Sequence, residues 1–65
     1  MLSAIEQIVS VYVSLRSRQR LEDMRLQRER AVLDLKSNSD YDMSMPVRQL
    51  EEEIAVIDAG LQKLA

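Results

Sequence analysis

The 65-residue sequence contains no cysteine and no histidine, and these two absences remove most of the chemistry open to a small protein. Without cysteine the chain has neither disulfides nor thiolate metal ligands. Without histidine it lacks the commonest metal ligand and the usual general base near neutral pH. A single glycine cannot build a glycine-rich phosphate loop. We therefore expect a protein that is not an enzyme and that holds neither a metal nor a cofactor.

Proline and aromatic residues are almost as scarce, with one proline, two tyrosines and no phenylalanine or tryptophan. An all-β fold would need turn residues at regular spacing, and these are missing. The common residues are instead leucine, arginine, glutamate, glutamine, alanine and methionine, which favour helices. The composition predicts an all-α fold in a single domain spanning residues 1–65.

The apolar first fifteen residues lack the features of a targeting segment. They carry no basic stretch and no small-residue cleavage site, they include Glu6, and they are too short to span a bilayer. We therefore expect no membrane partner and a cytoplasmic location, with which the absence of cysteine is compatible. An amphipathic helix lying on a membrane surface is the alternative for this segment.

Turn-forming residues cluster only at positions 37–42, and this cluster divides the chain into two helices. The pattern predicts a long first helix over about residues 3–37, a turn over 38–44 and a second helix over about 45–64. Two helices joined by a short turn fold back on each other. The predicted architecture is therefore an antiparallel two-helix hairpin.

The predicted helix ends carry recognisable capping residues. Ser3 and Glu6 match the S-x-x-E capping box, in which each side chain accepts a hydrogen bond from a free N–H of the first turn. Pro46 suits the first turn of the second helix, where its missing N–H is not needed. Ser44 is the candidate cap for that helix.

Apolar residues at steps of three and four assign the core of the hairpin. In the second helix this spacing forms one uninterrupted heptad-like stripe, and the second half of the first helix carries a matching stripe. The predicted hairpin core consists of Leu21, Met24, Val32, Leu35, Val47, Leu50, Ile54, Ile57, Leu61 and Leu64.

The first half of the first helix carries another apolar stripe, on nearly the opposite side. A second helix of about 20 residues is roughly 30 Å long, so it cannot reach the first fifteen residues. Each isoleucine or valine left in water there would forgo about 1.5–3 kcal/mol. We therefore predict that two hairpins pair through this stripe into a four-helix bundle-like homodimer. The alternative is that a different protein, the functional target of the chain, covers the stripe. The predicted dimer interface consists of Ile5, Ile8, Val9, Tyr12, Leu15 and Gln19.

Six arginines fall between positions 16 and 30 and raise the question of nucleic-acid binding. They spread around the helix, whereas phosphate contacts require one face. Several have an acidic residue four positions away, and the net charge of the chain is −2. These features argue against nucleic acid and favour a salt-bridged surface or a protein-recognition patch. The run Glu51–Glu53 is read as a solvated acidic face, because consecutive helical residues point in different directions.

The predicted turn offers a second recognition candidate. Tyr41 is flanked by acidic residues and lies near two methionines, a composition typical of binding hot spots. The alternative is that Tyr41 and Met43 close the open end of the hairpin core. The candidate partner-binding residues are Arg16, Arg18, Arg20, Asp40, Tyr41, Asp42 and Met43.

The leading functional hypothesis is a small adaptor or inhibitor that binds and blocks or sequesters a partner protein. In size and plan the chain resembles the small helical proteins with which phages and mobile elements disable host regulators. It also resembles the short hairpin co-chaperones of secretion systems. The alternatives are a structural or co-chaperone subunit of a larger assembly, and a dimer that binds nucleic acid through the arginines of the first helix.

Overall fold

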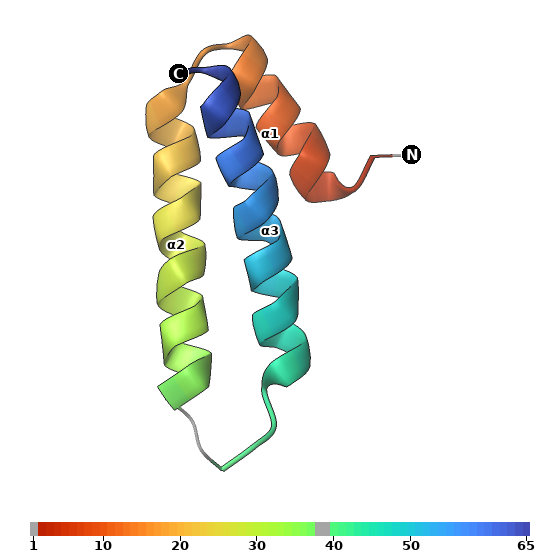
Figure 1. The fold of residues 1–65 in the computed structure, drawn as a ribbon, viewed down its shortest axis with the longest axis vertical. Coiled ribbons are helices and arrows are strands. Elements are labelled where there is room, and N and C mark those ends of the chain that lie inside the picture. The colour runs from red at the N-terminus through yellow and green to blue at the C-terminus, as the bar shows by residue number, and fades with distance from the viewer. Residues whose placement is uncertain (1, 38–39) are drawn as a thin grey trace.

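The computed structural model describes residues 2–37 and 40–65, and this part of the chain is all-helical (Figure 1). It contains α1 (Ala4–Ser14), α2 (Arg18–Ser37) and α3 (Ser44–Lys63), with no strand among the described residues. The prediction of an all-α fold is confirmed. α3 begins and ends within one residue of the predicted second helix.

The sequence left open whether the predicted first helix continues through residues 16–20, and the structure divides it there into α1 and α2. The N–H of Arg16 donates to the carbonyl of Val13, and the N–H of Ser17 donates to the carbonyl of Tyr12, at 3.0 and 2.9 Å. With Arg16 in the left-handed region at φ 55°, this pair of bonds forms a Schellman cap. Such a cap normally uses glycine, which the sequence does not have here. The break turns α1 back beside α3 (Figure 1).

Side chains cap the starts of α1 and α3. At α1 the predicted capping box is confirmed: Glu6 N–H donates to Ser3 Oγ, and Ser3 N–H donates to Glu6 Oε1, both at 3.3 Å. At α3 the expected cap Ser44 is wrong, since Met43 takes the cap position. The carboxylate of Asp42 accepts the N–H of Ser44 at 3.0 Å instead. Residues 38 and 39 of the predicted turn lie outside the described residues.

α2 and α3 run antiparallel and side by side (Figure 1). Leu21 and Ile57 are fully buried between them near the end where α1 docks. Val32 and Val47 are buried nearer the α2–α3 turn. The other residues assigned to the hairpin core are partly buried: Met24, Leu35, Leu50, Ile54, Leu61 and Leu64.

α1 lies along the C-terminal half of α3 only (Figure 1). Val9 is 5% exposed and packs with Leu21 and Ile57 in one core cluster. The approach of the two helices depends on the buried Gly60. A Cβ built there would lie 2.5 Å from Cγ1 of Val9 and 3.2 Å from Cγ2 of Val13. The missing side chain therefore makes room for α1.

The molecule is more extended than its mass requires. Its Cα extents are 41 × 26 × 14 Å and its radius of gyration is 12.9 Å, against about 10.7 Å for a compact chain of this length. Its accessible surface is 4992 Å², against about 4,250 Å² for a compact monomer of this mass. The elongated shape therefore exposes roughly 700 Å² more surface than a compact chain of this mass would.

Candidate functional site

The hollow beside the α2–α3 turn gathers several of the predicted partner-binding residues. Its volume is about 450 Å³. Its lining has apolar members from all three segments around the turn, together with charged side chains of both signs. The lining residues are Leu35, Lys36, Tyr41, Asp42, Met43, Ser44, Val47, Arg48 and Glu51. We call this hollow, together with the side chain of Met45 in the first turn of α3, the turn-end surface.

Two large side chains of the turn-end surface project into solvent. Tyr41 is 71% exposed and Met45 is 73% exposed. Because Tyr41 is exposed, the structure does not place it as a lid over the hairpin core, and Met43 is half-buried. Met45 is one of the two methionines noted near Tyr41 in the sequence, but it was not among the predicted candidates. Its position directly before Pro46, in the first turn, was the signal that it could remain exposed.

Asp42 fixes the backbone that carries these side chains. Its carboxylate accepts the backbone N–H of Ser44, which together with the Ser44 hydroxyl holds the pKa of Asp42 below its usual value. A carboxylate bonded to the first N–H groups of a helix also compensates the positive end of its dipole. This hydrogen bond restrains the backbone at the start of α3. Asp40 is exposed and does not line the hollow.

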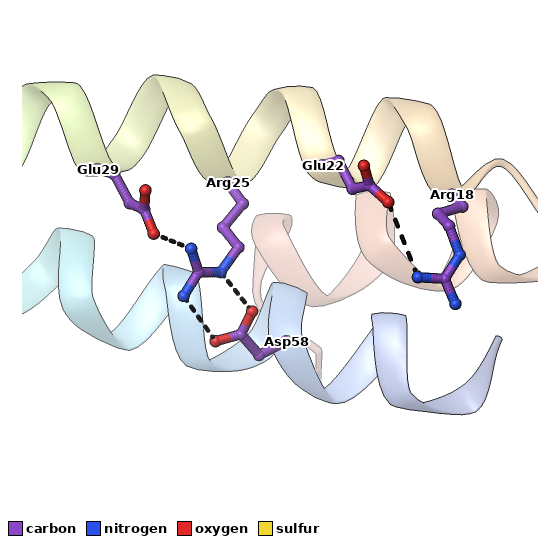
Figure 2. Close-up of polar contacts among 5 residues, drawn as sticks. All are labelled: Arg18, Glu22, Arg25, Glu29 and Asp58. Atoms are coloured by element: carbon purple, nitrogen blue, oxygen red, sulfur yellow. Dashed lines mark hydrogen bonds and ion pairs between the residues drawn. The ribbon is translucent and has the colours of Figure 1, made fainter. Parts of the chain in front are cut away.

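The three predicted arginines lie at the other end of the molecule. Arg16 occupies the break between α1 and α2, and Arg18 and Arg20 lie in the first turn of α2. Arg18 approaches Glu22 at 3.7 Å (Figure 2). The structure therefore does not bring these arginines together with Tyr41 into one site.

The remaining ion pairs hold α2 to α3. Nε of Arg25 donates to Oδ1 of Asp58 at 2.6 Å, and Nη2 donates to Oδ2 at 3.4 Å, while Nη1 pairs with Glu29 (Figure 2). The bond to Asp58 raises the pKa of Arg25. Nε of Arg28 donates to Oε1 of Glu53 at 2.9 Å. Because three of the five arginines of α2 pair with carboxylates, α2 does not present a row of free cations for phosphates.

Two residues of the acidic run on α3 pair with cations of α2. Glu51 lies 3.9 Å from Lys36, and Glu53, which is only 22% exposed, lies 2.9 Å from Arg28. Among the described residues no group of three or more acidic side chains could hold a metal ion. Within the same part of the chain, no helix is long and apolar enough to cross a bilayer.

The predicted dimer interface has to be corrected because α1 folds back. Val9 belongs to the core of its own chain, and Ile5 and Tyr12 pack against that core. Their predicted role between two chains assumed a helix that projected away from α3. Ile8 and Leu15 remain exposed. Gln19 is exposed and donates to Asp23 within α2 at 2.9 Å.

The exposed face of α1 differs from the predicted stripe. Ala4, Ile8, Val11 and Leu15 all lie in solvent, with Ile8 at 44%, Val11 at 55% and Leu15 at 69% exposure. Steps of four, three and four place them on one side of the helix. The predicted dimer interface included Ile8 and Leu15 but neither Ala4 nor Val11. We call these four residues the α1 stripe.

Comparison with known proteins adds no functional assignment. No family model, no curated protein and no solved structure matches the chain.

Proposed function

We propose that this chain is a small non-catalytic protein-binding module, an adaptor or inhibitor that holds a partner protein on the turn-end surface. The observation that carries the proposal is the exposure of two large side chains at the α2–α3 turn, Tyr41 in the lining of the hollow and Met45 in the first turn of α3. Tyrosine and methionine are enriched at protein interfaces, and hot spots centre on such side chains. Leaving both side chains in water has a cost that binding removes.

The surroundings of Tyr41 support the same function. The lining of the hollow carries charges of both signs, on Lys36, Arg48, Asp42 and Glu51, beside its apolar side chains. Apolar and charged side chains together are usual in a protein interface. The bond from Ser44 to Asp42 orders the backbone before binding, which lowers the entropy lost when a partner docks. A partner with an apolar anchor and both charge signs at its edge fits this surface.

A structural or co-chaperone subunit is the second candidate, and the α1 stripe favours it. Side chains as large as Ile8, Val11 and Leu15 on one helix face suit assembly with another helix. Binding of nucleic acid receives no such support. The arginines of α2 are spread over the helix, and three of them are already paired with carboxylates.

The test is capture of interacting proteins by crosslinking to purified wild-type and variant chains. Tyr41→Ala/Met45→Ala removes the two exposed side chains, and Leu26→Ala removes an exposed apolar side chain of α2 as the matched control. We expect the double variant to weaken binding about tenfold or more, as loss of hot-spot residues does. Circular dichroism should be unchanged, because all three side chains are exposed. Equal capture by the double variant and the wild type would contradict the proposal.

A further inference from the structure

The α1 stripe has the geometry of a helix-pairing face. At 100° per residue its four members fall within an arc of about 60°. This arc is centred about 130° away from Val9, which faces the core of the same chain. α1 therefore has two apolar faces, of which its own chain covers one. Exposed leucine, isoleucine and valine at heptad spacing are what a second helix packs against.

The chemistry of α1 restricts what that second helix can be. Glu6 is the only charged residue between Ala4 and Ser14. Its carboxylate is bonded to Ser3, and it points to the side of the helix away from the stripe. A charged or basic surface would find no counter-charge here. The complementary surface is an uncharged apolar helix, and α1 itself is such a helix.

We propose that a second copy of this chain covers the α1 stripe, with the two α1 helices packed antiparallel about a twofold axis. The steps of four, three and four read the same in both directions, so the stripe complements itself when one copy is reversed. Leu15 of one copy then lies opposite Ala4 of the second copy, and Ile8 lies opposite Val11. Each pair joins a larger side chain to a smaller one, which fills the interface evenly.

Charge favours this arrangement. A parallel pair would place the two Arg16 side chains together, whereas the antiparallel pair separates them by about 20 Å along the helix axis. The turn-end surface lies at the other end of the molecule from the break beside Leu15 (Figure 1). The proposed dimer contact therefore does not involve the turn-end surface, and the dimer presents two turn-end surfaces, one on each chain.

The first experiment is light scattering on a sizing column from micromolar to millimolar concentrations. We expect twice the 7.5 kDa of one chain for the wild type. Val11→Asp should halve that mass, because a charge would enter a dry interface. Ser10→Asp adds the same charge to an exposed position of α1 outside the stripe and should leave the dimer intact. Both variants should keep the wild-type circular dichroism, since neither position is buried.

Engineered cysteines test the orientation, and the chain has no native cysteine to interfere. A mixture of Ala4→Cys and Leu15→Cys chains should form a mixed disulfide dimer on oxidation. Leu15→Cys alone should stay uncrosslinked, because its two sulfurs would be much farther apart than a disulfide allows. Crosslinking of Leu15→Cys alone would overturn the antiparallel arrangement.

Other outcomes of the mass measurement are equally decisive. A wild-type monomer at every concentration would overturn the dimer and leave the stripe to a different protein. Dissociation by Ser10→Asp as complete as that by Val11→Asp would show that the stripe is not the interface. Capture of partners at Tyr41 is measured separately on the Val11→Asp chain. Failure of the dimer and failure of the turn-end surface are therefore distinguishable.

Discussion

Val9 and Gly60 are so close that a Cβ atom on Gly60 would lie 2.5 Å from Cγ1 of Val9. The side chain of valine is β-branched and stiff, so Gly60→Ala would push α1 away from α3. We expect the free energy of unfolding in urea to fall by about 1–3 kcal/mol, as overpacking does. Alanine at an open helix position would instead stabilise by about 1 kcal/mol. The direction of the change therefore separates the two effects.

Two further variants control this measurement. Ala55→Gly, at an exposed position of α3, reports helix propensity alone and should cost about 1 kcal/mol. In the double variant Val9→Ala/Gly60→Ala the clashing methyl group is gone, so the loss should be smaller than the sum of the single losses. Simple additivity would show that the two residues do not share a contact.

Arg16 has a left-handed backbone that glycine would adopt more easily. The conformation costs a non-glycine residue about 1–2 kcal/mol, while glycine costs about 0.5–1 kcal/mol in unfolded-state entropy. Arg16→Gly should therefore raise the free energy of unfolding by about 0.5–1 kcal/mol. The same change inside α2, Arg20→Gly, should lower it by about 1 kcal/mol. Equal losses in both variants would contradict a left-handed residue at position 16.

The two ion pairs between α2 and α3 should differ in strength and in salt sensitivity. Arg28 and Glu53 are 23% and 22% exposed, whereas Arg25 and Asp58 are 36% and 42% exposed. Exposed pairs contribute only about 0.2–1 kcal/mol and are screened by salt. Double-mutant cycles to alanine should therefore give the larger coupling for Arg28 and Glu53. The coupling free energy of Arg28 and Glu53 should also persist at about 1 M salt. If salt reduced it more than it reduces the coupling of Arg25 and Asp58, the predicted difference between the two pairs would be wrong.

Asp42 should make the stability of the protein depend on acid. Its bond from Ser44 N–H lowers its pKa in the folded state, so the unfolded state binds a proton at higher pH. The stabilisation is present above the unfolded value of about 4 and is lost as the pH falls through the lower folded value. Asp42→Asn keeps an acceptor that does not titrate. Its melting temperature should fall less than that of the wild type on acidification, and parallel losses would contradict this role.

Helix ends and buried positions could be predicted from the sequence where local signals and tertiary packing agree. The capping box at Ser3, the limits of α3 and the buried positions Leu21 and Ile57 all follow from spacing and capping residues. The break after Ser14 could not be read in the same way, because the segment contains neither glycine nor proline. The sequence did contain one indication of the break, because the apolar face of the first helix changes sides near residues 16–20. Burial of Val9 and Val13 against Gly60 outweighs the strain at Arg16, and that balance depends on tertiary contacts.

The same error affected the predicted surfaces. Since the first half of the first helix was expected to project beyond the second helix, Val9 was assigned to a partner chain. The arginines Arg16, Arg18 and Arg20 were a recognition candidate separate from the turn around Tyr41, and the structure keeps the two at opposite ends of the molecule (Figure 1). For Tyr41 the sequence left exposure and closure of the hairpin core as alternatives, and the side chain is exposed.

Because α1 covers only the C-terminal half of α3, resistance to opening should vary along the hairpin. Amide hydrogens near Leu21 and Ile57 are protected by three helices and should exchange with solvent only through global unfolding. Those near Val32 and Val47 are held by two helices and should exchange through smaller local openings. The end of the hairpin where α1 docks should therefore resist local opening, and the end where Tyr41 is exposed should open more easily. A partner bound at the Tyr41 end would slow amide exchange there and raise the melting temperature of the whole chain.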